Sequence, residues 1–160
     1  MEDWTSVRRP LHALVTVRGG LQFLLLAVHL KAGIDANSAQ QRLRQITQIT
    51  TWAQAQSRPL LIMGDFNDTF EGIADGVDTL QPLEDATALG TFLTAAIGDY
   101  TSLQFLDLID HVFISESIIH HVVPLSTTTV KFDEDPTYDG FVISDHRPVR
   151  FEMTVPSDCD

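Results

Sequence analysis

Apolar residues along the chain gather in short runs separated by polar or glycine-containing links. Two runs of β-compatible residues, Leu11 to Val17 and Leu21 to His29, flank the link Arg18-Gly19-Gly20. Apolar runs joined by a short glycine-containing link are typical of a β-hairpin. The sequence therefore predicts a hairpin of two antiparallel strands over these ranges.

A helix is predicted after the hairpin, with Asn37 or Ser38 as its N-cap and an end near Ser57. Apolar residues recur at steps of three or four and form one stripe: Ala39, Leu43, Ile46, Ile49 and Ala53. The other side of the helix is predicted to carry the polar residues Gln40, Arg42, Arg44 and Gln48.

The stretch LLIMGDFND, from Leu60 to Asp68, follows this helix. Its four apolar residues between Pro59 and Gly64 predict a strand buried on both faces, with Asp65 and Asn67 just beyond its carboxyl end. Open α/β sheets place ligand sites there, although Asp and Asn also form ordinary turns. Strand, helix and strand together predict a right-handed parallel crossover.

The pattern weakens from Thr69 to Asp99, where we expect loops and a short helical turn within Leu83 to Leu89. An acidic loop, Asp133-Glu134-Asp135-Pro136, is expected to be solvated. Further strands are predicted over three ranges: Ile109 to Ser115, Ile119 to Lys131 in broken form, and Pro148 to Val155.

Polar residues interrupt the apolar pattern at three more strand boundaries. His29 ends the run LQFLLLAVH, Asp110 opens the strand DHVFIS, and Asp145 and His146 lie within ISDHRPV. A lone histidine is more often structural than catalytic, and an unpaired carboxylate at the start of an apolar strand is costly. Together with Asp65 and Asn67, these residues put two histidines, three carboxylates and an amide at strand ends, which is how a fold assembles one site.

Charge narrows the candidate functions. The 160 residues carry a formal net charge of −12, which disfavours unaided binding of nucleic acid or an anionic membrane. A phosphate-binding protein with this charge needs a divalent cation or local positive charge, and Lys31, Arg42 and Arg44 offer at most a small basic patch.

The single cysteine, Cys159, excludes an intrachain disulfide, and no apolar segment is long enough to span a membrane. The first residues, MEDWTSVRRP, lack a signal-peptide core.

Four motifs in order, HL at His29, GDFN at Gly64 to Asn67, LIDHVFIS around Asp110 and SDHRPV around His146, resemble the endonuclease/exonuclease/phosphatase family, which is related to pancreatic-type deoxyribonuclease. The likeness extends from about Pro10 to the C-terminus. The segment from Tyr100 is similar to the family's secreted bacterial nuclease and phosphoesterase branch, which makes a secreted or cell-surface location possible. The resemblance implies an α/β (α+β by some schemes) two-sheet sandwich with outer helices and metal-assisted cleavage of phosphate esters.

The resemblance also implies a role for each matching residue. His146 matches the imidazole near the scissile phosphate, and Asp110 the carboxylate that orients it, a base-and-orienter arrangement like that of hydrolytic triads. Asp145 and Asp65 match carboxylates near the metal or its water, Asn67 an amide donor to phosphate, and His29 a second donor. Oxygen ligands of this kind favour Mg²⁺, Mn²⁺ or Ca²⁺. Arg147 could pair with phosphate or form an outward salt bridge.

The chain also departs from the family pattern. Family members carry a first half with an asparagine and a metal-binding glutamate, whereas here 28 residues precede His29 and Glu2 lies in a polar lead. We therefore expect residues 1–160 to form a single partial domain that binds metal weakly. The apolar sheet face left without the first half predicts a homodimer or a complementing N-terminal half.

Two function classes follow. One is a divalent-metal phosphodiesterase or nuclease, acting on DNA, RNA, lipid or small phosphate esters. The other is a catalytically incomplete fragment or interaction module that needs a second chain.

Overall fold

The computed structural model describes residues 9–72, 77–135, 137 and 144–155, and it has a mixed α/β fold. A five-stranded sheet with the order β1-β2-β3-β5-β4 forms its centre. These strands are β1 (Leu11–Thr16), β2 (Gln22–His29), β3 (Leu60–Asp65), β4 (Gly90–Phe92) and β5 (Asp110–Ser115). A second, two-stranded sheet pairs β6 (Thr128–Thr129) with β7 (Val149–Arg150). The helices are α1 (Ala36–Gln54), α2 (Gln81–Glu84) and α3 (Glu116–Ile119), with 3-10 turns η1 (Leu93–Ala96) and η2 (Phe132–Glu134).

The N-terminal half follows the pattern of the sequence. β1 and β2 form the predicted antiparallel hairpin, and β2 runs parallel to β3 after the α1 crossover. β5 is antiparallel to β3. Asp65 is the last residue of β3 rather than the first beyond it, because its backbone still pairs with Asp110 at the start of β5.

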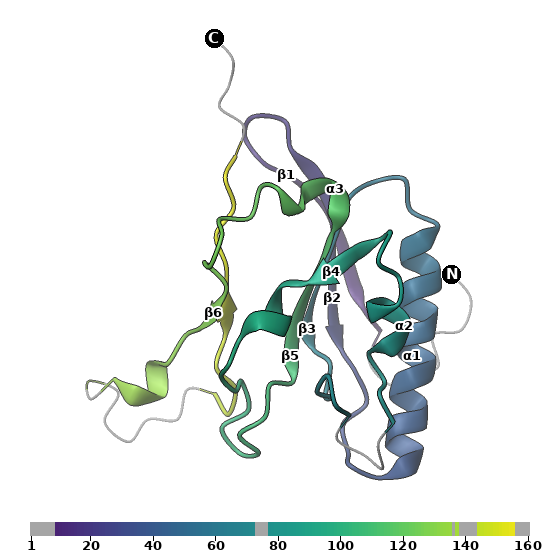
Figure 1. The fold of residues 1–160 in the computed structure, drawn as a ribbon, viewed down its shortest axis with the longest axis vertical. Coiled ribbons are helices and arrows are strands. Elements are labelled where there is room, and N and C mark those ends of the chain that lie inside the picture. Colours follow the sequence, from purple (N-terminus) through teal and green to yellow (C-terminus); the bar gives the residue numbers. More distant parts are fainter. Residues whose placement is uncertain (1–8, 73–76, 136, 138–143, 156–160) are drawn as a thin grey trace.

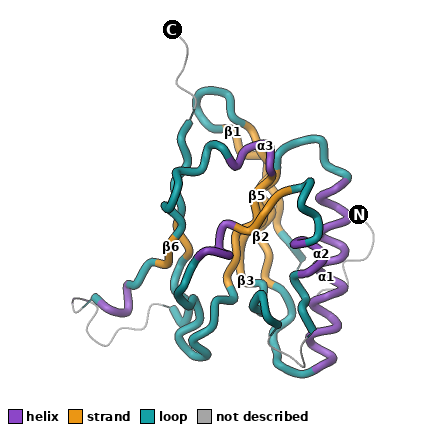
Figure 2. The backbone as a smooth tube through the Cα atoms, in the orientation of Figure 1, coloured by secondary structure: helices purple, strands orange, loops and turns teal. Residues whose placement is uncertain are grey.

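The sheet has two differently covered faces. On one face α1 and α2 bury a core that includes Leu26, Ile62 and Phe113, and Figure 1 shows α1 lying along this side. On the other face Val112 and Ile114 pack against α3 and against the chain around β7. In Figure 2 that second covering is mostly loop, with the short β6 strand within it. The two-sheet architecture with outer helices expected from the sequence is thus present, with a small second sheet.

Helix α1 corrects two expectations. Its N-cap is Asp35, whose side chain accepts hydrogen bonds from the backbone N–H groups of Asn37 and Ser38, so these two residues lie inside the first turn. Arg42 is not on the solvent side, because its side chain is fully buried against Asp68. The predicted basic patch therefore loses Arg42.

The second half differs more from expectation. Most of the range Ile119 to Lys131 is irregular, with α3 ending in it and β6 near its end, and the range from Pro148 contains only the short β7 among its described residues. Strand β4 was not predicted. The acidic loop is not simply solvated, because Asp133 and Glu134 form ion pairs with buried Arg147. Glu2 and Cys159 lie outside the described residues.

Among the described residues, no helix combines the length and apolarity that crossing a bilayer requires.

Candidate active site

Strand register aligns the first three polar residues of the site. His29 pairs with Asp65 across β2 and β3, and Asp65 pairs with Asp110 across β3 and β5. Directly paired residues point to the same face of a sheet, so the three side chains form a row. The row lies on the face opposite α1, because Leu61, four residues before Asp65, and Val112, two residues after Asp110, belong to the core of that face.

His146 joins this row from the C-terminal segment. Its Nδ1 lies 2.7 Å from Asp110 Oδ2, so the imidazole donates an N–H to the carboxylate. Thr101 binds the backbone on both sides of this contact: its hydroxyl oxygen accepts the N–H of Asp110, and its carbonyl accepts the N–H of Arg147, the residue after His146. The sequence prediction that His146 and Asp110 meet is thus matched by the geometry.

Two opposing effects set the protonation of His146. Partial burial alone would lower its pKa, but the hydrogen bond to Asp110 and the negative charges of Asp110, Asp65 and Asp145 raise the pKa above its ordinary value of 6.5. The charges of three carboxylates, and not of Asp110 alone, therefore act on the His146 imidazole.

Asp65 is held by Asn67 and His29. The backbone N–H of Asn67 donates to Asp65 Oδ1, and its amide donates to Oδ2, each over 2.8 Å. His29 Nε2 lies 3.3 Å from the same Oδ2. Burial, and then the charge of Asp110, raise the pKa of Asp65, although the Asn67 N–H opposes this shift. Asn67 also donates to the carbonyl of Leu30, so both N–H bonds of its amide are directed into the protein.

All six predicted site residues line one open cleft of about 440 Å³. Asp145 lies at its exposed edge and is fixed through its backbone, where its carbonyl accepts the N–H of Leu103. Ala32, Ser102, Gln104, Phe105, Ile109 and Ser144 complete the lining. The sequence identified the histidines, the carboxylates and Asn67 of this cleft but none of the loop residues between 101 and 105 that form its wall.

The residues only partly fit the divalent metal expected from the family resemblance. Asp65 and Asp145 offer the oxygen donors that hard cations prefer. Asp65 already accepts three hydrogen bonds or ion-pair contacts on its two oxygens, and a carboxylate has about four lone-pair positions. Within the described part of the chain, no group of three or more His, Cys, Asp or Glu residues is arranged to hold a metal ion. The donor chemistry thus suits a hard ion, with few protein ligands.

Arg147 follows His146 but does not face the cleft as a free cation. It is 1% exposed, donates to both oxygens of Asp133 over 2.8 and 2.6 Å, and also pairs with Asp99 and Glu134. Its guanidinium lies 4.2 Å from the centre of the Tyr100 ring. Of the two roles considered for Arg147, the salt bridge is the one present, and it points inward.

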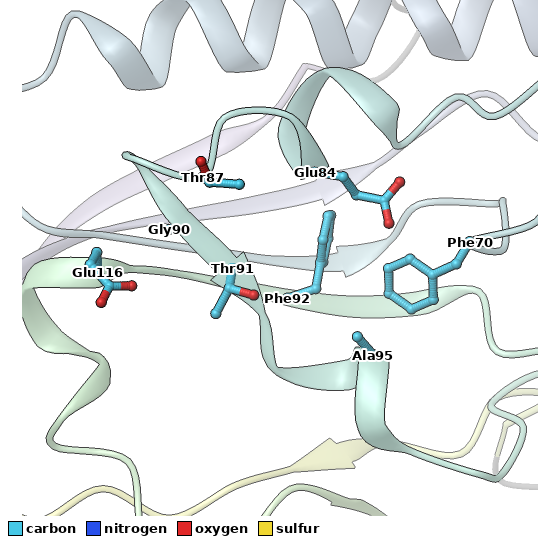
Figure 3. Close-up of a pocket in the computed structure, with 8 residues that line it drawn as sticks. All are labelled: Phe70, Glu84, Thr87, Gly90, Thr91, Phe92, Ala95 and Glu116. Carbon is cyan, nitrogen blue, oxygen red and sulfur yellow. The ribbon is translucent and has the colours of Figure 1, made fainter.

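A second hollow of about 370 Å³ lies along the edge strand β4 (Figure 3). Phe70 and Phe92 form its apolar part, and Glu84 and Glu116 lie toward its two ends. Burial and the neighbouring Asp78 raise the pKa of Glu84 to about 7. None of the six predicted site residues lines this hollow, so it is distinct from the cleft.

Comparisons with known proteins concern the family and the fold of the chain. The model of the Endonuclease/Exonuclease/phosphatase family matches residues 2–146. A protein of that description from Beutenbergia cavernae superposes with a TM-score of 0.70 at 16% identity, covering 91% of this chain and 39% of its own. Beta toxin from Staphylococcus aureus gives a TM-score of 0.61 at 15% identity, with coverages of 89% and 56%. A mannosyl-6-phosphatase from Bacteroides thetaiotaomicron gives 0.50 at 20%, with coverages of 84% and 52%.

The chain thus spans between about two fifths and just over half of the length of these three structures. At such low identities the likeness concerns the fold. A comparison with curated protein sequences found no match.

Proposed function

The chain belongs to the endonuclease/exonuclease/phosphatase family, and from that premise we propose that its cleft hydrolyses phosphate esters with the help of a divalent metal. The observation that carries the proposal is the hydrogen bond of 2.7 Å between His146 and Asp110, in the same cleft as Asp65 and His29. Hydrolysis of a phosphate ester needs a proton acceptor for water and donors that stabilise charge on the phosphate oxygens. This cleft contains side chains suited to both tasks.

Each residue has a distinct task in this mechanism. Asp110 accepts the Nδ1 hydrogen of His146, which fixes the imidazole and leaves Nε2 to exchange a proton with water or the leaving oxygen. His29, whose side chain is 48% exposed, donates to a phosphate oxygen. Asp65 orients water through its carboxylate. Asn67 fixes the orientation of the Asp65 carboxylate, and its amide would donate to phosphate only by giving up one of its internal hydrogen bonds.

The metal is the second part of the proposal. Asp145 and the remaining lone pair of Asp65 would hold Mg²⁺, Mn²⁺ or Ca²⁺, and a bound ion would neutralise charge on the nonbridging phosphate oxygens. The net charge of −12 supports a need for such a cation, since the protein's own field repels phosphate. Arg147 does not meet that need, because carboxylates already surround its guanidinium.

The test is hydrolysis of bis-p-nitrophenyl phosphate and of plasmid DNA with each of the three metals and with a chelator. We expect metal-dependent turnover that the chelator abolishes. We expect His146→Ala to lower kcat by about 100-fold or more, because a general base contributes at least this factor. The matched control is His120→Ala, since His120 is an exposed histidine at the end of α3 and should leave turnover unchanged. Turnover that survives His146→Ala would rule out this site.

A second candidate is a catalytically incomplete domain that requires another chain. The small number of metal-ligating side chains favours it, since within the described residues no group of three could hold an ion. In this version a second copy, or a separately encoded N-terminal half, covers the β1–β2 part of the sheet and supplies the missing ligand. Turnover that appears only on association would support this candidate over the first.

A further inference from the structure

We propose that the buried ion pair of Arg42 and Asp68 is the positioning device of the cleft. It ties the loop after β2, which follows His29, to the loop after β3, which carries Asn67. Arg42 and Asp68 act on substrate only through these loops. The inference rests on the proposed phosphoesterase function for its kinetic consequences, whereas its structural claim concerns the two loops alone.

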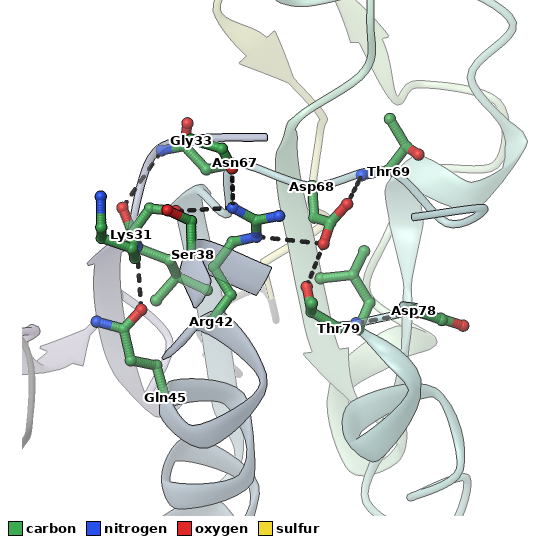
Figure 4. Close-up of polar contacts among 12 residues, drawn as sticks. Lys31, Gly33, Ser38, Arg42, Gln45, Asn67, Asp68, Thr69, Asp78 and Thr79 are labelled. Atoms are coloured by element: carbon green, nitrogen blue, oxygen red, sulfur yellow. Dashed lines mark hydrogen bonds and ion pairs between the residues drawn. The ribbon is translucent and has the colours of Figure 1, made fainter. Parts of the chain in front are cut away.

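Arg42 reaches the first loop from helix α1. Its side chain is 0% exposed, and Nη1 donates to the carbonyl oxygens of Gly33 over 2.6 Å and of Lys31 over 3.1 Å. Gln45, one turn further along α1, accepts the N–H of Lys31 over 3.0 Å. Figure 4 shows the guanidinium placed between this loop and Asp68. The chain directly after His29 and Leu30 is therefore fixed to α1.

Asp68 anchors the second loop through both its side chain and its backbone. Oδ2 accepts from Arg42 Nε over 3.2 Å and from the hydroxyl of Thr79, and Oδ1 accepts the N–H of Thr69 (Figure 4). The carbonyl of Asp68 accepts from His111 Nε2 over 2.8 Å. Burial lowers the pKa of His111 to about 4, so the ring is neutral near pH 7, with its hydrogen on Nε2 and Nδ1 facing Thr94. Residue 68 thus has little freedom to rotate.

The residue before this anchor has an unusual backbone. Asn67 has φ of 55°, in the left-handed region that a non-glycine residue occupies at some cost. This conformation lets both its backbone N–H and its amide reach the two oxygens of Asp65. Because Asp68 is held at the next position, the left-handed turn is kept. The ion pair therefore determines where the Asp65 carboxylate lies, although neither Arg42 nor Asp68 lines the cleft.

Stability alone does not explain the ion pair. Arg42 lies on the buried side of α1 with Ala39, Ile46 and Ile49, where an apolar residue would avoid the cost of burying a charge. One of its nitrogens, Nη2, is buried without a hydrogen-bond partner among the described residues. An apolar pair could fill the same space, but it could not make directed bonds to two loops at once. Such a local departure from the core pattern is what a positioning role predicts.

The experiment compares the wild type with Asp68→Asn, with the double variant Arg42→Met/Asp68→Leu, and with the control Arg44→Met. The double variant leaves no unpaired charge, and Arg44 is an exposed arginine of the same helix that does not line the cleft. Three measurements are made: urea unfolding, the ¹³Cα and ¹³Cβ chemical shifts of Asn67 as a report of its backbone, and kcat and KM with bis-p-nitrophenyl phosphate. The shifts need no activity, and they remain informative if the proposed function fails.

We expect both pair variants to move the Asn67 shifts away from left-handed values in protein that urea unfolding shows to be folded. We expect kcat to fall about 100-fold, the loss that a displacement of about 1 Å causes, with a much smaller change in KM. Arg44→Met should change neither. If the double variant does not fold, Asp68→Asn decides. Unchanged Asn67 shifts in a folded pair variant would overturn the inference, whereas moved shifts without turnover in the wild type would count against the proposed function alone.

Discussion

The hydrogen bond between Asp110 and His146 helps to set the charge state of the His146 imidazole. In Asp110→Asn the bond to a carboxylate and its charge are lost, while the burial that lowers the pKa of His146 remains. We therefore expect the imidazole of His146 to titrate at lower pH in Asp110→Asn than in the wild type. An NMR titration of the His146 ring measures this directly.

The same change has a kinetic consequence. If neutral His146 is the base, turnover rises with pH through the pKa of His146, and the acid limb of kcat/KM moves to lower pH in Asp110→Asn while kcat falls by about 100-fold. An acid limb of kcat/KM that does not move with Asp110→Asn would mean that another group titrates.

The raised pKa of His146 also contributes to the stability of the folded protein. This contribution is present below pH 6.5 and is lost as pH rises through the folded-state pKa.

Gly64 lies where strand β3 passes very close to strand β2. Its φ is +135°, and a Cβ built on it would lie 2.1 Å from the carbonyl oxygen of Val28 on β2. Gly64→Ala should therefore lower the unfolding free energy by about 1–3 kcal/mol from backbone strain, and further through this collision. It should also lower turnover, because the paired residues His29 and Asp65 follow at the next positions.

Urea unfolding and kcat measurements test this prediction. Gly98→Ala is the matched control, because a Cβ at that exposed glycine has no heavy atom within 4 Å and its φ requires no glycine. Equal stability of the two variants would contradict the close approach of β2 and β3 at Gly64.

The elements predicted correctly from the sequence are those with a clear apolar run or a clear periodic pattern. The hairpin, α1, β3 and β5 each carry enough apolar residues to indicate their type and extent. Strands β4 and β6 have three and two residues, and their pairing depends on neighbours that local sequence does not reveal. The helical period also predicted that Arg42 faces solvent, because the period reflects only which residues are polar. It cannot reveal the ion pair with Asp68, 26 positions away.

The candidate site residues stood out in the sequence for a related reason. Polar residues at strand ends stand out against apolar runs, and the four motifs in order matched these residues to the site of one family. Asp68 stood in the same stretch as Asp65 and Asn67 but gave no separate signal, since an aspartate after a strand is common in turns. Thr101, which accepts the backbone N–H groups of Asp110 and of Arg147, the residue after His146, lies in a loop without pattern.

The whole molecule exposes apolar surface on the sheet face that carries the cleft. Leu11 is 74% exposed, and its register partner Ala27 and the neighbouring Leu25 are only partly buried. We propose that a second copy of the chain covers this part of the face, in line with the partner expected from the sequence. Leu11→Glu should then weaken self-association measured by analytical ultracentrifugation at micromolar concentration.

The control is Leu125→Glu, since Leu125 is fully exposed in a loop and should not affect association. A folded wild type that sediments as a monodisperse monomer would contradict the homodimer. Association that requires an added N-terminal half would support the complementing chain in its place.

The row formed by His29, Asp65 and Asp110 restricts how the length of the protein can change during evolution. Side chains of a strand alternate between faces, so insertion or deletion of one residue inside β3 would turn Asp65 toward α1. A change of two residues would restore the face but shift the carboxylate by about 7 Å along the strand, away from both partners. Descendants of this sequence can therefore change length at loops away from the cleft, while β3 must inherit its residue count unaltered for the cleft to persist.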